Sequence, residues 1–442
     1  MTSGPGSATH LPFEEEHVTT GLSAAPRRHE LRAGWRTLLG ATTGIGVGVA
    51  VLPLYTLGLA IPELEQAFGW SRTQLSSLQL IGSLCLIVTA PLVGSLIDRL
   101  GPRTPAVFSL AALGLGFGAL SLAGPSFALY LAVFVAMYLL ASGSTPVSFT
   151  RAINTRFHRA RGLALGLALA GAGVVAFLVP VVMGPRFAVD WRTAYRVLAA
   201  VVLLVAVLVW VLMARGRPAA GDDPATEAPP PSSVSASWRD IAPWMRSGLF
   251  IRLMAAYLVL ALAVGGLTVH LVPLLRDAGV TPARAAVTAG SIGIAIIVGR
   301  LVVGALIDRL FAPAVTAVVL LVAAAGYAAL LLGGPSLAVV AALGVGLALG
   351  AEVDVIGYLT ARYYPLEHYG RLFGVFYAAF TLGIGASPVL IAWLRELTGG
   401  YTTPLAACTV LLVLASLLFA TAPRFPRAPA DTPSVAPRQP TA

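Results

Sequence analysis

Charged residues inside long apolar runs are the features of this sequence that could do chemistry. Arg300 lies within the run 285–307, eight residues before Asp308, and therefore about 12 Å inside that end of a helix. An arginine within a membrane helix costs roughly 2.5–3.5 kcal/mol on insertion scales, and such charges usually serve function. Because a guanidinium can hold a carboxylate through two parallel hydrogen bonds, we expect Arg300 to anchor an anionic substrate. The alternative is a structural ion pair with an acidic residue of a neighbouring helix.

Two acidic residues, Glu352 and Asp354, lie in the run 336–358 at about the depth of Arg300. Residues two positions apart on a helix point in nearly opposite directions, so both cannot easily face one cavity. We expect at least one to couple transport to protons; the alternative is that both serve helix packing. A substrate anion on Arg300 would weaken the attraction between that arginine and a carboxylate, and would thereby promote protonation.

Two further residues are candidates for contact with a substrate. His270 lies near the end of the run 249–275, and the ordinary pKa of its imidazole suits a proton-linked step. Tyr55 could present a hydroxyl group to a ligand. For His270 the alternative is a place in the polar interface of the membrane, and for Tyr55 it is packing.

The same short pattern ends two apolar runs that are 210 positions apart. The two strings are Gly94-Ser95-Leu96-Ile97-Asp98-Arg99 and Gly304-Ala305-Leu306-Ile307-Asp308-Arg309. The repetition predicts two related halves, which is how many transporters are built. An Asp at such a turn can accept hydrogen bonds from a helix N-terminus and latch one conformation; the alternative is that the charges only set topology. The candidate conformational gate comprises Gly94, Asp98, Arg99, Gly101, Arg103, Gly304, Asp308 and Arg309.

Composition places these residues in a membrane protein. Apolar residues form 57% of the chain and charged residues 11%, whereas soluble domains carry roughly a quarter charged residues. A spanning helix needs about 20 mostly apolar residues. The sequence therefore predicts an all-α membrane protein with 12 transmembrane helices in two pseudo-symmetric six-helix bundles. The predicted helices are 37–61, 77–97, 105–124, 126–149, 162–183, 194–214, 249–275, 285–307, 314–333, 336–358, 372–394 and 402–421.

The arginines predict the orientation of these helices. With both ends of the chain on one side, 21 of the 29 arginines lie on that side and 7 on the other. Because basic residues favour the cytoplasmic side, both termini are expected in the cytoplasm. The predicted organisation is a cytoplasmic tail 1–34, a bundle 35–214, a cytoplasmic linker 215–248, a second bundle 249–421 and a cytoplasmic tail 422–442.

Several classes of function are disfavoured. The basic residues, all arginine, are spread among apolar runs rather than lining one face, so no nucleic-acid partner is expected. Cys85 and Cys408 stand alone in apolar runs, which indicates neither a disulfide nor a metal site. No phosphate-binding loop or catalytic signature is present. We therefore expect a non-enzyme without cofactor, working as a monomer whose partners are the lipid bilayer, an anionic small molecule and protons.

The first string continues as Gly94-x-x-x-Asp98-Arg99-x-Gly101-x-Arg103, which resembles the signature of the major facilitator superfamily. Finer features resemble its monocarboxylate porter and oxalate–formate antiporter branches. They are Phe68-Gly69-Trp70-Ser71-Arg72, Trp191-Arg192-Thr193-Ala194-Tyr195, His270-Leu271-Val272-Pro273 and Gly299-Arg300. One difference is Ile296, which stands where monocarboxylate porters carry an acidic residue.

The resemblance implies the major facilitator fold and a secondary transporter in the bacterial cytoplasmic membrane. The expected cargo is a small organic anion, preferably a monocarboxylate, carried by alternating access with proton coupling. Two alternatives remain open at this stage. One is proton-driven efflux of an amphipathic compound or drug, and the other is a membrane sensor or scaffold that does not transport.

Overall fold

The computed structural model describes residues 27–158, 160–213 and 238–425, which form helices and no strand. Short 3₁₀ turns at Ser142–Ser144, Gly334–Leu337 and Leu366–His368 join some of the helices. The α-helices are α1 (Arg27–Ala33), α2 (Trp35–Gly46), α3 (Leu52–Phe68), α4 (Arg72–Leu100), α5 (Arg103–Leu120), α6 (Phe127–Ala141), α7 (Pro146–Arg156), α8 (Arg161–Val189), α9 (Trp191–Met213), α10 (Trp238–Met245), α11 (Gly248–Asp277), α12 (Pro282–Ile307), α13 (Ala312–Gly333), α14 (Ala338–Tyr363), α15 (Tyr369–Thr398) and α16 (Thr402–Ala420).

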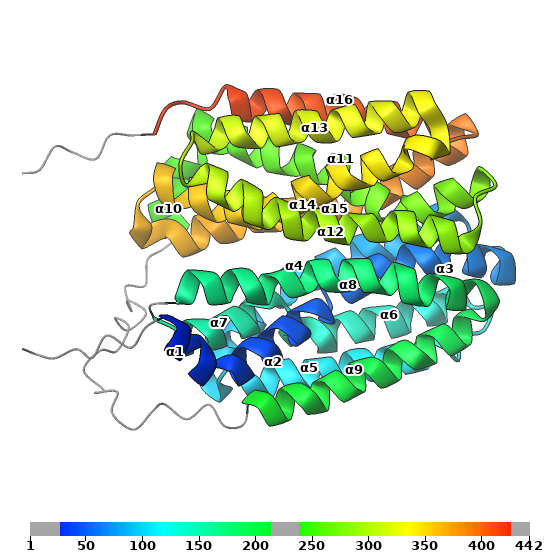
Figure 1. Cartoon of the computed structure of the whole chain (residues 1–442), viewed down its shortest axis with the longest axis horizontal. Helices are drawn as coiled ribbons and strands as arrows, with labels where there is room; N and C mark the ends of the chain where they lie inside the picture. Colours follow the sequence, from blue (N-terminus) through cyan, green and yellow to red (C-terminus); the bar gives the residue numbers. More distant parts are fainter. Residues whose placement is uncertain (1–26, 159, 214–237, 426–442) are drawn as a thin grey trace, which may run out of the picture.

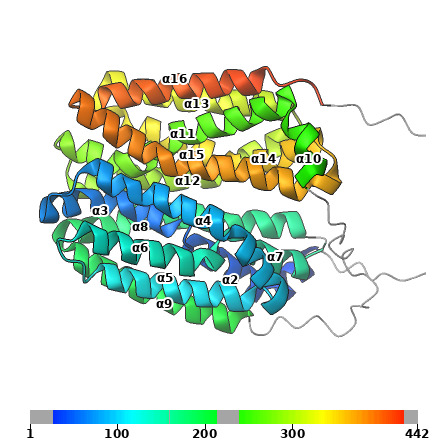
Figure 2. The same cartoon turned by 180° about the vertical axis from the view of Figure 1, so that it is seen from behind.

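The helices form two groups that lie side by side (Figures 1 and 2). Helices α1–α9 make up the first half and α10–α16 the second half. Helices α1, α7 and α10 lie at the same end of the molecule, which we call the terminus side, and the other end is the opposite side. The all-helical fold class predicted from the sequence is confirmed.

The predicted number of twelve spans is not established by helix length and apolarity alone. In the described chain, ten helical stretches are long and apolar enough to cross a membrane. The first predicted span is divided into α2 and α3, each too short for that measure. Helices α13 and α14 follow one another through a 3₁₀ turn and count as one stretch. All twelve predicted segments are nevertheless helical over most of their length.

Parts of the predicted tails and linker lie outside the described residues. These are 1–26, 214–237 and 426–442. The last part of the predicted linker contains helix α10, and its Ile241 is fully buried. The ring of Trp244 also meets Tyr364 edge to face, with ring centroids 5.9 Å apart. This short helix is held because its apolar side packs against the second half.

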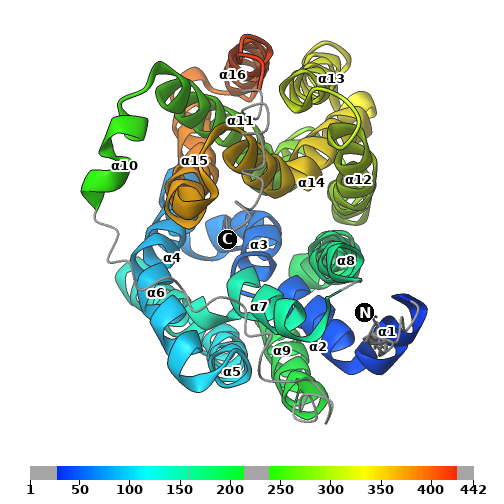
Figure 3. The ribbon, with the colours of Figure 1, turned by 90° about the vertical axis from the view of Figure 1, so that its left-hand side faces the viewer.

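The packing of the helices repeats between the halves. Helix α5 packs on α9 in the first half as α13 packs on α16 in the second, and α2 packs on α8 as α11 packs on α15. Across the halves, α4 packs on α15 and α8 on α12 (Figure 3). The contact of α4 with α15 corresponds to that of α12 with α8, because α4 and α12 are equivalent helices of the two halves, as are α8 and α15. The repeat of 210 positions predicts this correspondence.

Paired glycines make these close contacts possible. A Cβ atom added at Gly171 would lie 2.1 Å from the carbonyl oxygen of Thr42, and one at Gly383 would lie 3.0 Å from that of Leu258. These contacts are within one half. Two residues further on, Gly173 and Gly385 face helices of the other half, α12 and α4. These Gly-x-Gly pairs thus let the backbones of neighbouring helices approach closely.

We predict that Gly293→Ala destabilises the contact between α8 and α12. A Cβ atom there would lie 2.2 Å from the backbone nitrogen of Phe177, which cannot turn aside as a side chain can. Overpacking of this kind costs about 1–3 kcal/mol, so the midpoint of thermal unfolding in detergent should fall. Gly166→Ala is the control, because the space around Gly166 is open. Equal stability of the two variants would contradict the prediction.

Candidate functional site

A cavity of about 520 Å³ opens between the halves on the terminus side. The first half contributes residues of α7 and α8, such as Asn154 and Leu165. The second half contributes Asp354 and Tyr358 of α14, with Tyr369 and other residues of α12 and α15. The volume lies within the range of about 300–1,000 Å³ typical of sites for small molecules.

Arg300 lies just behind the wall of this cavity. Its side chain is only 9% exposed, and its Nη1 atom is 3.6 Å from Oδ1 of Asp354, which itself lines the cavity. Among the described residues, no hydrogen-bond acceptor meets the buried Nε and Nη1 atoms of Arg300. A buried guanidinium with unused donors is costly unless a further acceptor can reach it. The arrangement therefore combines the ion pair considered from the sequence with free capacity for an anion.

Glu352 lies deeper than Asp354, and its buried Oε2 atom has no hydrogen-bond partner among the described residues. It interacts electrostatically with both Arg300 and Asp354. The structure thus brings both acids near Arg300, although only Asp354 lines the cavity. Charges interact over several ångströms in an interior of low dielectric constant, so opposite directions on one helix do not separate them electrically. We call Arg300, Glu352 and Asp354 the charged cluster.

Two tyrosines border the charged cluster. Tyr55 of α3 is 8% exposed and close enough to Glu352 for their charges to interact. Tyr377 of α15 is within electrostatic reach of Glu352 and Arg300. Tyr55 therefore lies beside the charged cluster, and it brings the first half to this centre. Tyr377 was not a candidate from the sequence, because its proximity to Glu352 and Arg300 depends on tertiary packing.

The candidate gate residues of the first string make contacts within the first half. Asp98 pairs with Arg151 of α7 at 2.6 Å, and both side chains are about half exposed. Arg103 donates a hydrogen bond to the carbonyl oxygen of Trp210 at 2.9 Å, and its guanidinium lies 3.8 Å from that indole ring. Gly101 has φ +73°, a conformation that favours glycine, and it ends α4. In this conformation, therefore, the ion pair between Asp98 and Arg151 lies within the first half and does not join the halves.

The second string borders the cavity. Gly304 and Asp308 both line it, whereas Arg309, like Arg99 of the first string, is exposed. A Cβ atom added at Gly94 or Gly304 would meet nothing within 4 Å. The two glycines that the repeat shares thus face open space here, so packing in this conformation does not explain why they are small.

His270 lies away from the charged cluster, towards the opposite side. It is fully buried, with Nε2 3.1 Å from the hydroxyl of Ser76 and 3.0 Å from the carbonyl oxygen of Pro388. Its Nδ1 atom is 3.1 Å from the hydroxyl of Tyr401. Ser76 belongs to the first half and the other two partners to the second. The structure therefore places His270 between the halves rather than beside the cavity or at a lipid interface.

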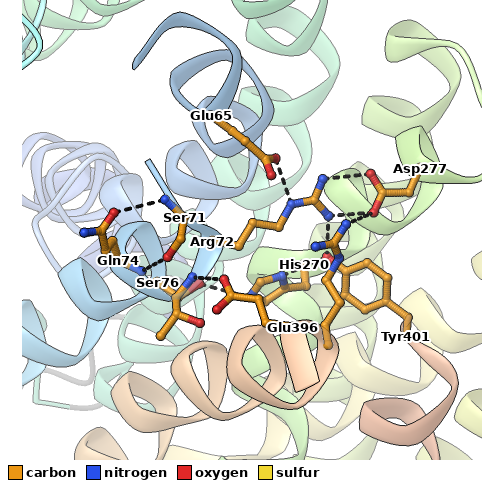
Figure 4. Close-up of polar contacts among 11 residues, drawn as sticks. Glu65, Ser71, Arg72, Gln74, Ser76, His270, Asp277, Glu396 and Tyr401 are labelled. Carbon is orange, nitrogen blue, oxygen red and sulfur yellow. Dashed lines mark hydrogen bonds and ion pairs between the residues drawn. The ribbon is translucent and has the colours of Figure 1, made fainter. Parts of the chain in front are cut away.

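Beyond His270, ion pairs join the two halves on the opposite side (Figure 4). Arg72, the first residue of α4, donates to both carboxylate oxygens of Asp277 at 2.6 and 2.7 Å. The same guanidinium donates to Glu65 at 2.9 Å and to the hydroxyl of Tyr401 at 3.0 Å. Its side chain is 6% exposed. A bidentate pair of this kind is among the stronger polar contacts.

Further contacts extend this junction. Arg395 donates to Asp277 at 2.9 Å, and Arg276 pairs with Glu63 of the first half. Burial raises the pKa of Tyr401 to about 12, so its hydroxyl keeps a proton that it can donate to His270. We call this set the interhalf cluster. It comprises Glu63, Glu65, Arg72, His270, Arg276, Asp277, Arg395 and Tyr401.

Two residues of the interhalf cluster, Arg72 and His270, stand in motifs of the sequence, but the cluster itself was not predicted. Arg72 follows Ser71, the N-cap residue of α4, and Ser71 forms a capping box with Gln74 through hydrogen bonds of 3.0 and 3.1 Å. The available signal was that Arg72 and Asp277 have opposite charges and end helices on the same predicted side. Nothing in the sequence shows that these ends meet, because the residues are 205 positions apart.

A membrane protein whose halves enclose a cavity at one end and meet in ion pairs at the other has the architecture of an alternating-access transporter. A sequence model of the Major Facilitator Superfamily matches residues 43–356, and the chain belongs to this superfamily.

Relatives of known name belong to a more specific group than the superfamily. Monocarboxylate transporter 13 of Rattus norvegicus is 27% identical over 408 residues, which is 89% of each chain. Monocarboxylate transporter 11 of Mus musculus is 26% identical over 415 residues, with 88% of each chain covered. The resemblance to monocarboxylate porters noted in the sequence is thereby confirmed.

Solved structures agree on the fold. Two structures of a bacterial homologue of the human lysosomal transporter Spinster match with TM-scores of 0.66 and 0.67, at 16% and 19% identity. They cover 88% and 90% of this chain, and 96% of each matched chain. Both are described as inward-facing, one occupied and one unoccupied. At this identity the likeness shows the fold alone.

We predict that Asp277→Asn weakens closure of the opposite side. A hydrogen bond to a charged group contributes about 1.5–3 kcal/mol, so the ratio of closed to open molecules should fall about tenfold or more. Spin labels at Gln66→Cys and Thr398→Cys, with both native cysteines replaced, would report an added population at longer distance. Both labelled positions are exposed and lie in different halves on this side.

Arg284→Gln is the matched control for this experiment, since Arg284 is an exposed arginine on the same side. Exchanging the charges in an Arg72→Asp, Asp277→Arg double variant should restore part of the closed population. An unchanged distance distribution in Asp277→Asn would show that the ion pair does not hold the halves together.

Proposed function

We propose that this transporter is a secondary active carrier of a small organic anion, preferably a monocarboxylate, which moves together with protons. The observation that carries the proposal is the pair of buried, unpartnered donor atoms on Arg300, next to a cavity between the halves. The names of the curated relatives support the same class of cargo. Efflux of an amphipathic compound remains the second candidate.

Arg300 fits the role of anion anchor through its geometry and burial. Its guanidinium is tethered to Asp354 at 3.6 Å, which is an ion pair but longer than a good hydrogen bond. A carboxylate entering beside Asp354 could accept a hydrogen bond from one of the unused donors. Because the surroundings exclude water, such a contact would be stronger than the same contact in solution.

The charges of the cluster supply a reason for proton coupling. Arg300 carries one positive charge, and Glu352 and Asp354 carry two negative charges when both are ionised. Adding a substrate anion would make the excess of negative charge larger in a medium of low dielectric constant. Binding a proton to one of the acids relieves this repulsion, so anion and proton each promote binding of the other.

Alternating access requires two conformations, of which this structure supplies one. The interhalf cluster closes the opposite side while the cavity opens on the terminus side. With both termini in the cytoplasm of a bacterium, as the arginine distribution favours, the cavity would face inward. The strings around Asp98 and Asp308 would then form contacts between the halves when the cavity closes.

The second candidate has one observation in its favour. Two acids near one arginine could also attract an amphipathic cation, which would suit proton-driven efflux of a drug. Uptake and counterflow of labelled acetate, lactate and a lipophilic cation in proteoliposomes, with and without a pH gradient, separates the two. Proton-driven carboxylate flux supports our proposal, and cation flux alone contradicts it.

We predict that Arg300→Lys lowers kcat/KM for the transported carboxylate about tenfold or more. A lysine keeps the charge but cannot present two parallel donors, and a hydrogen bond to a charged group contributes about 1.5–3 kcal/mol. Initial rates of uptake into proteoliposomes measure the effect. Arg284→Lys is the control, and thermal unfolding should show that both variants are folded. Wild-type transport by Arg300→Lys would remove Arg300 as the anchor.

We predict that neutralising the proton-carrying acid separates driven transport from exchange. Asp354→Asn is the first variant, because Asp354 lines the cavity where a proton can reach it. It should lose accumulation driven by a pH gradient and keep exchange without a gradient. Glu352→Gln is the comparison, because its carboxyl group is deeper. If both variants accumulate substrate like the wild type, the charged cluster does not carry the proton.

A further inference from the structure

Three aromatic residues form a continuous stack along one side of α15. Tyr369, Phe373 and Tyr377 are spaced by four residues, which places them on one face of the helix. The ring centroids of Tyr369 and Phe373 are 5.8 Å apart with planes inclined by 21°, and those of Phe373 and Tyr377 are 5.8 Å apart and inclined by 7°. We call these three residues the aromatic ladder.

The aromatic ladder differs from the packing aromatics of the same helix. Phe376 is fully buried and packs against Phe250 and Tyr257, so it holds α15 within the second half. Members of the ladder, in contrast, are only partly buried, and Tyr369 and Phe373 line the cavity. Packing of α15 therefore uses one aromatic face, while a second aromatic face is presented to the cavity.

The ladder leads from the cavity to the charged cluster. Tyr369 is the first residue of α15, and Tyr377 lies eight residues, or about 12 Å, further along the helix. At that depth Tyr377 is within electrostatic reach of Arg300 and Glu352. The buried ring of Phe380, 6.4 Å from that of Tyr377, follows at the inner end. Partly buried aromatic rings thus extend from the cavity to the neighbourhood of the unpartnered guanidinium of Arg300.

We propose that the aromatic ladder is a stacking surface for the ring of the substrate, so that the preferred cargo is an aromatic monocarboxylate rather than a short aliphatic acid. The proposal rests on the anion site at Arg300. The carboxylate binds Arg300 while the ring lies against Phe373 and Tyr377. Aromatic rings favour offset-stacked or edge-to-face contacts, which add to the effect of burying apolar surface.

Size and charge both favour this class of ligand. A cavity of about 520 Å³ exceeds what a carboxylate of two or three carbons can fill, and unfilled apolar surface contributes nothing to binding. An aromatic cation could use the same rings through cation–π contacts. It would, however, leave the two buried donors of Arg300 without an acceptor, which favours the carboxylate.

The test is calorimetric binding of four probes to the purified full-length protein in detergent. The probes are phenylacetate, cyclohexylacetate, acetate and phenethylamine. We expect phenylacetate to bind at least threefold tighter than cyclohexylacetate, because the saturated ring is not flat, and acetate to bind more weakly still. This comparison uses the wild-type chain and does not depend on the folding of any variant.

Phe373→Leu should weaken phenylacetate binding roughly threefold to tenfold and acetate binding by a smaller factor, since acetate has no ring to stack on Phe373. Phe108→Leu is the matched control, because Phe108 is an exposed residue of α5 outside the cavity. The Phe108→Leu variant should bind phenylacetate and acetate with the same affinities as the wild type.

Three results would overturn the proposal of an aromatic substrate, and they differ in what they imply for the anion site at Arg300. Equal affinity for phenylacetate and cyclohexylacetate, or for phenylacetate and acetate, would show that no aromatic ring is preferred, and the carboxylate proposal would survive. Tighter binding of phenethylamine than of phenylacetate would indicate a cation site. If no carboxylate binds, or if Arg300→Lys does not weaken carboxylate binding, the anion site is wrong and the ring preference fails with it.

Discussion

The low dielectric constant of a membrane interior is the constraint on which the rest of this structure depends. Backbone N–H and C=O groups that face lipid must be paired within their own segment, so the spanning chain is helical. Side chains obey the same rule, and an ionised group within the span persists only where it is paired or meets a ligand. The few charges placed among 57% apolar residues are therefore informative about function.

These charges form two clusters at different depths along the helices, and the clusters differ in how completely their charges are paired. In the interhalf cluster, Asp277 receives both terminal nitrogens of Arg72 and a third contact from Arg395. In the charged cluster, Arg300 has one long ion pair and two unused donors. The first arrangement is that of a closed junction. The second leaves capacity for a further partner, which supports the assignment of substrate to this level.

The two halves are joined by close contacts at glycines and by ion pairs. Gly173 and Gly385 bring α8 close to α12 and α15 close to α4, with backbones in direct contact. These contacts carry no charge, and they lie between the cavity on one side and the ion pairs on the other. Helices that touch through glycine can rock with little steric cost. The charges then decide which end of the junction is closed.

The sequence by itself determined the helices, the repeat and the cost of the charge at Arg300, because these depend on residues that are near one another in the chain. Apolar runs of about 20 residues predict spans, and the offset of 210 positions predicts the packing that recurs in both halves. It also determined the similar depth of Arg300, Glu352 and Asp354, since depth along a helix follows from counting residues.

The sequence could not decide which residues meet across helices. Three features depend on how far each helix is rotated and tilted against its neighbours. They are the contact of Arg72 with Asp277, the place of His270 between the halves and the proximity of Tyr377 to the charged cluster. That rotation is set by many weak packing contacts between distant parts of the chain, and only the tertiary structure contains them.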